Sequence, residues 1–70
     1  MGYKSAIKRD KLITLAQAHR AAGRRKEAFR LFREVLDDES ENLDALVNLT
    51  EMSLELRQFD VAASLILPLL

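Results

Sequence analysis

Few side chains of this 70-residue chain could carry out chemistry. His19 is the sole histidine and there is no cysteine, so no histidine and thiolate cluster can hold a transition metal, and we expect His19 to be a packed or half-exposed structural residue. The acidic run at residues 37–41 lacks the glycine and the alternating ligand spacing of a calcium loop. The serine and threonine residues have no convincing base near them, and no glycine-rich phosphate loop follows a strand. We predict that the protein is not an enzyme and holds neither a metal nor a cofactor.

A cluster of basic residues between positions 24 and 33 could contact phosphates. Proteins that bind single-stranded nucleic acid combine such cations with several stacking aromatic side chains. Here only Phe29 is available for stacking, because Phe32 falls at a core position of the predicted helix. We therefore interpret the cluster as a solvated helix face and disfavour nucleic acid as a partner. The cluster consists of Arg24, Arg25, Lys26, Arg30 and Arg33.

Charge is divided unevenly along the chain. Residues 1–35 carry ten basic and three acidic side chains, a balance of +7, whereas residues 36–70 carry one basic and eight acidic side chains, a balance of −7. Two interpretations stay open. The halves are either two solvated faces with some ion pairing between helices, or opposite ends that steer association with a second copy or a charged partner.

The apolar pattern predicts that helices position all of these residues. Two glycines, one proline and few β-branched residues favour helix over sheet. Gly23 suits the position just after a helix, and Ser40 or Asn42 can cap the N-terminus of the third helix. Apolar residues that recur three and four positions apart predict helices at about residues 5–22, 25–38, 42–56 and 60–69.

No stretch of the sequence has the length and apolar character of a membrane-spanning helix, which needs about 18 consecutive apolar residues. The N-terminus has no apolar run that resembles a signal peptide. We therefore expect no membrane span, and a cytoplasmic location by default.

The sequence repeats itself after 34 residues. Residues 9–36 align with residues 43–70 without a gap. A helix–turn–helix unit of this length is the spacing of the tetratricopeptide repeat. The identical pairs are Asp10/Asp44, Leu12/Leu46, Leu15/Leu49, Ala28/Ala62, Leu31/Leu65 and Leu36/Leu70, and the pairs Ile13/Val47, Phe32/Ile66 and Val35/Leu69 match in character.

The chain thus resembles two tetratricopeptide repeats, one at about residues 9–42 and one at about residues 43–70. The resemblance implies an all-α fold in which two antiparallel helix–turn–helix hairpins stack as a short right-handed solenoid within one domain. Thr50, Arg57 and Ser40 depart from the small residue, the turn glycine and the proline that the family usually has at these positions. The matching positions are Leu12, Leu15, Ala16, Gly23, Ala28 and Phe32 in the first repeat and Leu46, Leu49, Phe59, Ala62 and Ile66 in the second.

The resemblance also implies a binding surface for a peptide or protein segment on the concave side, lined by the first helix of each hairpin. Some family members clamp the terminal carboxylate of chaperones with a lysine and two asparagines. Asn48 matches one of these residues, but Ile13 and Gln17 replace the other two, which disfavours that ligand. The concave residues would be Ile13, Gln17, Arg20, Val47, Asn48, Glu51 and Leu54, joined by Thr14, Ala21 and Glu55. Alternatively, these residues pack against a neighbouring helix.

The C-terminal end carries more leucine than one narrow helix stripe can bury. Leu67 and Leu70 are left over, and Pro68 weakens the last turn. Because each repeat buries its face on the next, we expect either a fragment of a longer repeat array or a chain that buries this end by pairing with itself. The leading hypothesis is a non-catalytic protein–protein interaction module, a scaffold or adaptor. The alternative is a structural element that assembles into a homo-oligomer, such as a homodimer, through exposed helix faces.

Overall fold

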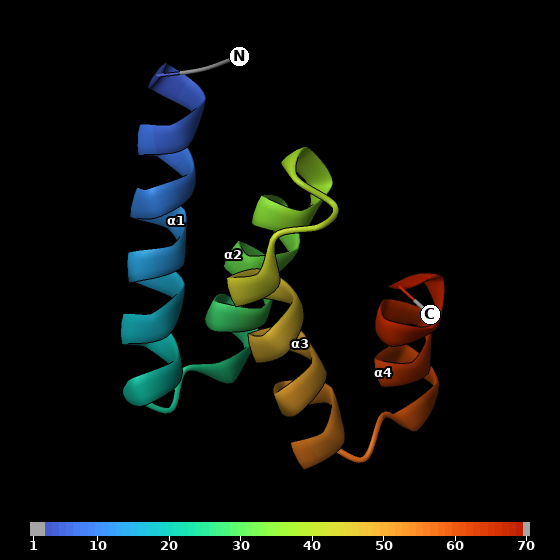
Figure 1. The fold of residues 1–70 in the computed structure, drawn as a ribbon. Coiled ribbons are helices and arrows are strands. Elements are labelled where there is room, and N and C mark those ends of the chain that lie inside the picture. The colour runs from blue at the N-terminus through green and yellow to red at the C-terminus, as the bar shows by residue number, and fades with distance from the viewer. Residues whose placement is uncertain (1–2, 70) are drawn as a thin grey trace.

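The computed structural model describes the backbone of residues 3–69 and the side chains of residues 6–68. Its described part consists of helices joined by short turns, and none of them is long and apolar enough to cross a membrane. Figure 1 shows the helices running alternately down and up, which confirms the predicted all-α fold of two antiparallel hairpins. The elements are α1 (Tyr3–Ala21), α2 (Arg25–Asp38), α3 (Leu43–Glu55), α4 (Phe59–Ile66) and the 3₁₀ turn η1 (Leu67–Leu69).

The predicted boundaries are close to the observed ones except at the C-terminus. The sequence pattern predicts a fourth helix that runs to residue 69, but α4 ends at Ile66 and the chain tightens into η1. Proline has no N–H to donate to the carbonyl four residues earlier, so Pro68 favours this change of geometry.

The turns within the two hairpins repeat in hydrogen-bond detail. At the first turn, the N–H of Gly23 donates to the Arg20 carbonyl over 3.1 Å and the N–H of Arg24 donates to the His19 carbonyl over 2.9 Å. These are the two bonds of a Schellman motif, which places its central residue in the left-handed region. Gly23 accordingly has φ +83°. The predicted role of Gly23 as the residue after the helix is confirmed.

The second turn makes the same bonds 34 residues later. The N–H of Arg57 donates to the Leu54 carbonyl over 3.0 Å, and that of Gln58 to the Ser53 carbonyl over 2.7 Å. Arg57 therefore has φ +59°, although it is not a glycine. The sequence repeat is thus also a repeat of backbone conformation.

The connection between the hairpins ends in a side-chain cap. The Oδ1 atom of Asn42 accepts a hydrogen bond from the N–H of Ala45 over 3.0 Å. Ser40 and Asn42 were the two capping residues predicted from the sequence, and Asn42 is the one that caps α3. This cap fixes where α3 begins and therefore how the second hairpin leaves the first.

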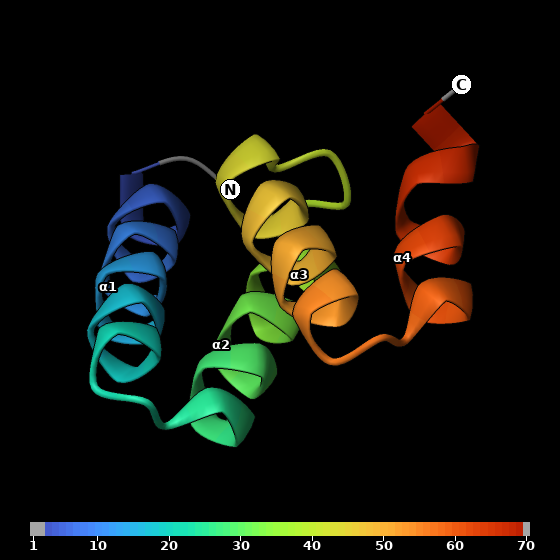
Figure 2. The ribbon, with the colours of Figure 1, turned by 90° about the horizontal axis from the view of Figure 1, so that it is seen from below.

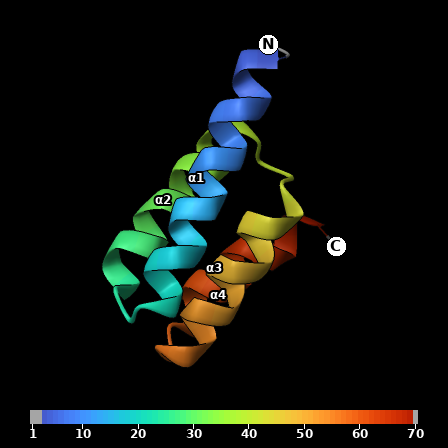
Figure 3. The ribbon, with the colours of Figure 1, turned by 90° about the vertical axis from the view of Figure 1, so that its left-hand side faces the viewer.

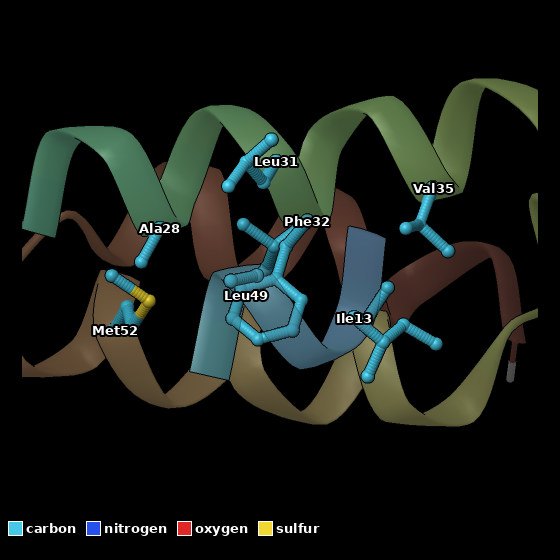
Figure 4. Packing of buried hydrophobic residues seen from close by; sticks show 9 residues of the cluster. Ile13, Ala28, Leu31, Phe32, Val35, Leu49 and Met52 are labelled. Atoms are coloured by element: carbon cyan, nitrogen blue, oxygen red, sulfur yellow. The ribbon is translucent and has the colours of Figure 1, made fainter. Parts of the chain in front are cut away.

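The core lies between the two hairpins. Seen from below, α2 lies between α1 and α3, and α4 lies on the far side of α3 (Figure 2). Figure 3 shows the hairpins from the side, with α1 against α2 and α3 against α4. In the close view, Ala28 and Met52 point toward one another and Phe32 lies beside Leu49 (Figure 4). The buried cluster comprises Ile13, Ala16, Ala28, Leu31, Phe32, Val35, Ala45, Leu49 and Met52.

Equivalent residues of the two repeats differ in burial, and three of the positions that match the repeat family are exposed. Leu15 is 52% exposed, whereas its counterpart Leu49 is completely buried against the first hairpin. Ile66 is exposed, whereas its counterpart Phe32 is buried beside α3. The reason is that the two described repeats share a single interface, so the outer face of each repeat has no neighbouring repeat in the described part of the chain. Phe59, the first residue of α4, is also exposed.

Candidate functional site

The centre of the candidate surface is a side-chain cluster that joins α1 to α3. Arg20 donates from Nη1 to Asn48 Oδ1 over 2.7 Å and to Glu51 Oε1 over 3.1 Å. Its Nη2 atom donates to Glu55 Oε1 over 3.2 Å. One guanidinium therefore holds three side chains that lie on successive turns of α3. We call these four residues the Arg20 cluster.

Asn48 is held at both ends of its amide. While Oδ1 accepts from Arg20, Nδ2 donates to the Asp44 carbonyl over 2.7 Å. This pairing fixes the direction in which the amide points. A fixed amide and two carboxylates beside one cation give a pre-oriented polar surface.

The ion pairs of the cluster are solvent-accessible. The Arg20 side chain is 26% exposed, while the Glu51 and Glu55 side chains are about half exposed. Exposed ion pairs typically contribute about 0–1 kcal/mol each to stability. The cluster therefore orients side chains more than it stabilises the fold, and its two carboxylates against one cation leave it net negative.

The other residues predicted for the concave surface divide into two groups. Gln17 is exposed on α1, and Leu54 is exposed on α3. Val47 lines a groove of about 260 Å³ together with Leu65 and Ile66 of α4. The side chain of Ile13, by contrast, belongs to the core cluster and is 9% exposed. The structure thus brings Arg20, Asn48 and Glu51 into one cluster and places Ile13 in the interior.

Comparison with known proteins identifies the family. A model of the tetratricopeptide repeat family matches residues 13–70, which is most of the chain. The chain belongs to the tetratricopeptide repeat family. Searches of curated proteins and of solved structures gave no match. Tetratricopeptide repeats generally mediate protein–protein interaction and are generally non-catalytic, which agrees with the interaction module expected from the sequence.

His19 has a structural role at the first turn of this tetratricopeptide chain. Its Nδ1 atom accepts a hydrogen bond from Arg24 Nε over 2.8 Å, across the turn that Gly23 forms. Among the described residues, no group of three or more histidine, aspartate or glutamate side chains lies close enough to hold a metal ion.

Arg9 ties the first helix to the connection between the repeats. Its Nη1 atom lies 3.3 Å from Glu39 Oε2, and its Nε atom donates to Asp10 over 3.1 Å. The pKa of Arg9 is raised above its ordinary value, first because Asp10 accepts that hydrogen bond and then because Glu39 attracts the positive charge. Arg9 therefore stays charged.

One pocket of the tetratricopeptide fold was not predicted from the sequence. It has a volume of about 500 Å³ and lies where α2 begins and the α3–α4 turn passes. The sequence pattern indicates only a solvated face for the basic cluster, but the structure sets Leu56 beside its one aromatic residue, Phe29. The presence of Phe29 among the cations was the only signal for this pocket in the sequence. Its lining residues are Arg25, Lys26, Phe29, Arg30, Leu56 and Gln58.

The two residues predicted for self-association are at the C-terminal end. Leu67 is 63% exposed in η1. Leu70 lies outside the described residues.

Proposed function

We propose that this chain is a scaffold or adaptor module that captures a peptide or protein segment on the surface formed by α1 and α3. The observation that carries the proposal is the Arg20 cluster, which presents an oriented amide and two half-exposed carboxylates. Around it, Gln17 and Leu54 add an exposed amide and an exposed apolar side chain. Such a combination suits a segment with N–H or cationic donors and an apolar side chain.

The net negative charge of the cluster argues against a ligand with a terminal carboxylate. A carboxylate would have to displace Glu51 or Glu55 from Arg20, and it would face the released carboxylate. The chain also lacks a lysine at the position where the resemblance calls for one, which is Ile13. We therefore expect neutral or basic segments to bind in preference to acidic tails.

Selection from a displayed peptide library tests this proposal. Selected peptides should bind the wild-type chain and lose at least about tenfold in affinity, or about 1.4 kcal/mol, on the triple variant Gln17→Ala, Asn48→Ala and Glu51→Ala. A matched triple variant on the exposed face of α2, with alanine at Arg33, Glu34 and Asp37, should bind normally. Equal circular dichroism spectra would establish that both variants are folded. Unchanged affinity on the first variant would refute the proposed surface.

A second candidate function is self-assembly, and the exposed apolar residues of the second repeat favour it. Val47 and Ile66 are exposed, whereas their counterparts Ile13 and Phe32 are buried in the core cluster. A second copy stacked on this face would bury Val47 and Ile66 together with Leu67. Light scattering at low and high salt tests this candidate: the wild-type chain should associate in both, and Leu67→Glu should be monomeric. A wild-type chain that is monomeric at all concentrations would exclude it.

A further inference from the structure

The pocket at the start of α2 combines apolar walls with a basic rim. Phe29 is half-buried and Leu56 is 44% exposed, so both offer apolar surface. Arg30 forms an ion pair with Glu27, in which Arg30 Nη2 lies 3.0 Å from Glu27 Oε2. Within residues 3–69, neither Arg25 nor Lys26 makes a side-chain ion pair. The pocket therefore suits a bulky apolar side chain that is flanked by carboxylates.

The same chain displays a segment of this chemistry elsewhere. Leu43, the first residue of α3, is 72% exposed, more than any other large apolar side chain among the described residues. Glu41 and Asp44 flank it and are themselves exposed. Neither carboxylate takes part in an ion pair or a side-chain hydrogen bond within the described part of the chain. Leu43 thus offers an apolar group between two available acids.

Leu43 cannot reach the pocket of its own chain. It begins α3, whereas Leu56 follows the end of α3, and a helix of this length separates the two positions by about 20 Å. Figure 1 shows that α2 begins near the end of the molecule where α3 finishes, so the start of α3 is the end of that helix farther from the pocket. A contact between Leu43 and the pocket must therefore join two molecules.

We infer that Leu43 of one copy docks into the basic-rimmed pocket of a second copy, with Glu41 and Asp44 against Arg25 and Lys26. This inference concerns self-association, as the second candidate function does, but it assigns a different contact. Leu43 also lines the groove with Val47 and Ile66, yet here it enters the pocket at the start of α2 of the second copy, so Leu67→Glu should still associate. It also gives the opposite charges of the two halves of the chain a function, because the acidic half of one copy meets the basic half of the next. Peptide capture by the Arg20 cluster is independent of it.

Apolar burial and charge have different effects in this contact. Burial of a leucine side chain supplies most of the affinity, because exposed ion pairs contribute little and salt screens them. The charges steer the two copies and fix their orientation. We therefore expect added salt to weaken the association several-fold without abolishing it.

Complementation between two defective variants is the decisive test, with sedimentation equilibrium as the measurement. Leu43→Ser removes the docking side chain and keeps every charge, whereas Arg25→Glu combined with Lys26→Glu disables the pocket. Wild-type mass should rise above 8.0 kDa with concentration, and each variant alone should stay at that mass. An equimolar mixture should form a heterodimer, because the intact pocket of the first variant accepts the intact Leu43 of the second.

Matched variants establish whether the loss of association is specific to this contact. Leu15→Ser makes the same chemical change at another exposed leucine, and Lys8→Glu with Lys11→Glu reverses two other exposed cations, so both should associate like the wild type. Circular dichroism should show equal helicity throughout. A monomeric wild-type chain, a Leu43→Ser variant that associates normally, or a mixture that stays monomeric would each overturn the inference. If Leu43→Ser associates normally but Leu67→Glu does not, self-assembly through the other face is retained and only this contact is excluded.

Discussion

Replacing Arg57 with glycine should stabilise the protein. Arg57 has φ +59° at the second turn, where Gly23 has φ +83° at the first. Both turns form the same pair of backbone hydrogen bonds, so the second turn requires the left-handed conformation just as the first does. A side chain with a Cβ atom is disfavoured there, and glycine is not.

The expected gain follows from two opposing terms. A residue other than glycine destabilises the folded state by about 1–2 kcal/mol when its backbone lies in the left-handed region. Glycine loses more backbone entropy on folding than other residues do, and this loss offsets about 0.5–1 kcal/mol of the gain from relieving the left-handed conformation. The net stabilisation for Arg57→Gly is about 0.5–1 kcal/mol, which for a domain of this size raises the Tm by about 2–8 °C.

Thermal and urea unfolding followed by circular dichroism measure this effect. Arg57→Ala is the control, because it removes the charged side chain and keeps the Cβ atom, so its Tm should stay close to that of the wild type. Gly23→Ala should have the opposite effect and lower the free energy of unfolding by about 1 kcal/mol. A Cβ atom at position 23 would meet nothing within 4 Å, so that loss comes from the backbone conformation alone. If Arg57→Gly lowers the Tm, or if Arg57→Ala raises it equally, the conformational explanation is wrong.

Three further changes test the packing and the caps. Ala28→Leu should destabilise the chain by about 1–3 kcal/mol, because Ala28 is fully buried where α2 faces its neighbours; urea unfolding measures the loss. Ser53→Ala should leave stability unchanged or raise it by up to about 1 kcal/mol in the same assay, because the buried Ser53 hydroxyl has no hydrogen-bond partner among the described residues. Asn42→Ala should lose about 1 kcal/mol through the missing cap on Ala45, and Asn42→Asp, which keeps a capping oxygen, should recover most of it.

The sequence was sufficient to predict the features that depend on local pattern. The recurrence of Leu12 and Ala28 after 34 residues predicted two similar hairpins, and the structure repeats them down to the turn hydrogen bonds. Gly23 was predicted to end a helix and Ser40 or Asn42 to cap one, because backbone and side-chain preferences of such residues act within a few positions. Such signals do not depend on distant parts of the chain.

Features that depend on the neighbour of each repeat could not be predicted in the same way. Leu15 and Leu49 occupy equivalent positions of the two similar repeats, yet Leu49 is buried in the core and Leu15 is exposed. Ile13 was assigned to the binding surface from the resemblance, but its side chain is buried in the core cluster. The sequence pattern records which side chains are apolar, whereas burial also depends on whether another element is present.

The polar contacts of Arg20 likewise could not be predicted from the sequence. Its partners lie 28 to 35 positions further along the chain, on a helix whose placement depends on how the hairpins stack. The resemblance placed Arg20, Asn48 and Glu51 on one surface, but it did not indicate that Arg20 would bind all of them at once. That geometry gives the candidate surface its fixed amide and its net negative charge.

Mapping of backbone amide chemical shifts tests the proposed binding surface most directly. A peptide selected on the wild-type chain would be titrated into ¹⁵N-labelled protein. We predict that the largest shift changes fall on α1 and α3 around Gln17, Arg20, Asn48 and Glu51, with small changes along the exposed face of α2. Shift changes concentrated on α2 or α4, with residues of the Arg20 cluster unaffected, would contradict the proposal that this tetratricopeptide chain captures its partner between α1 and α3.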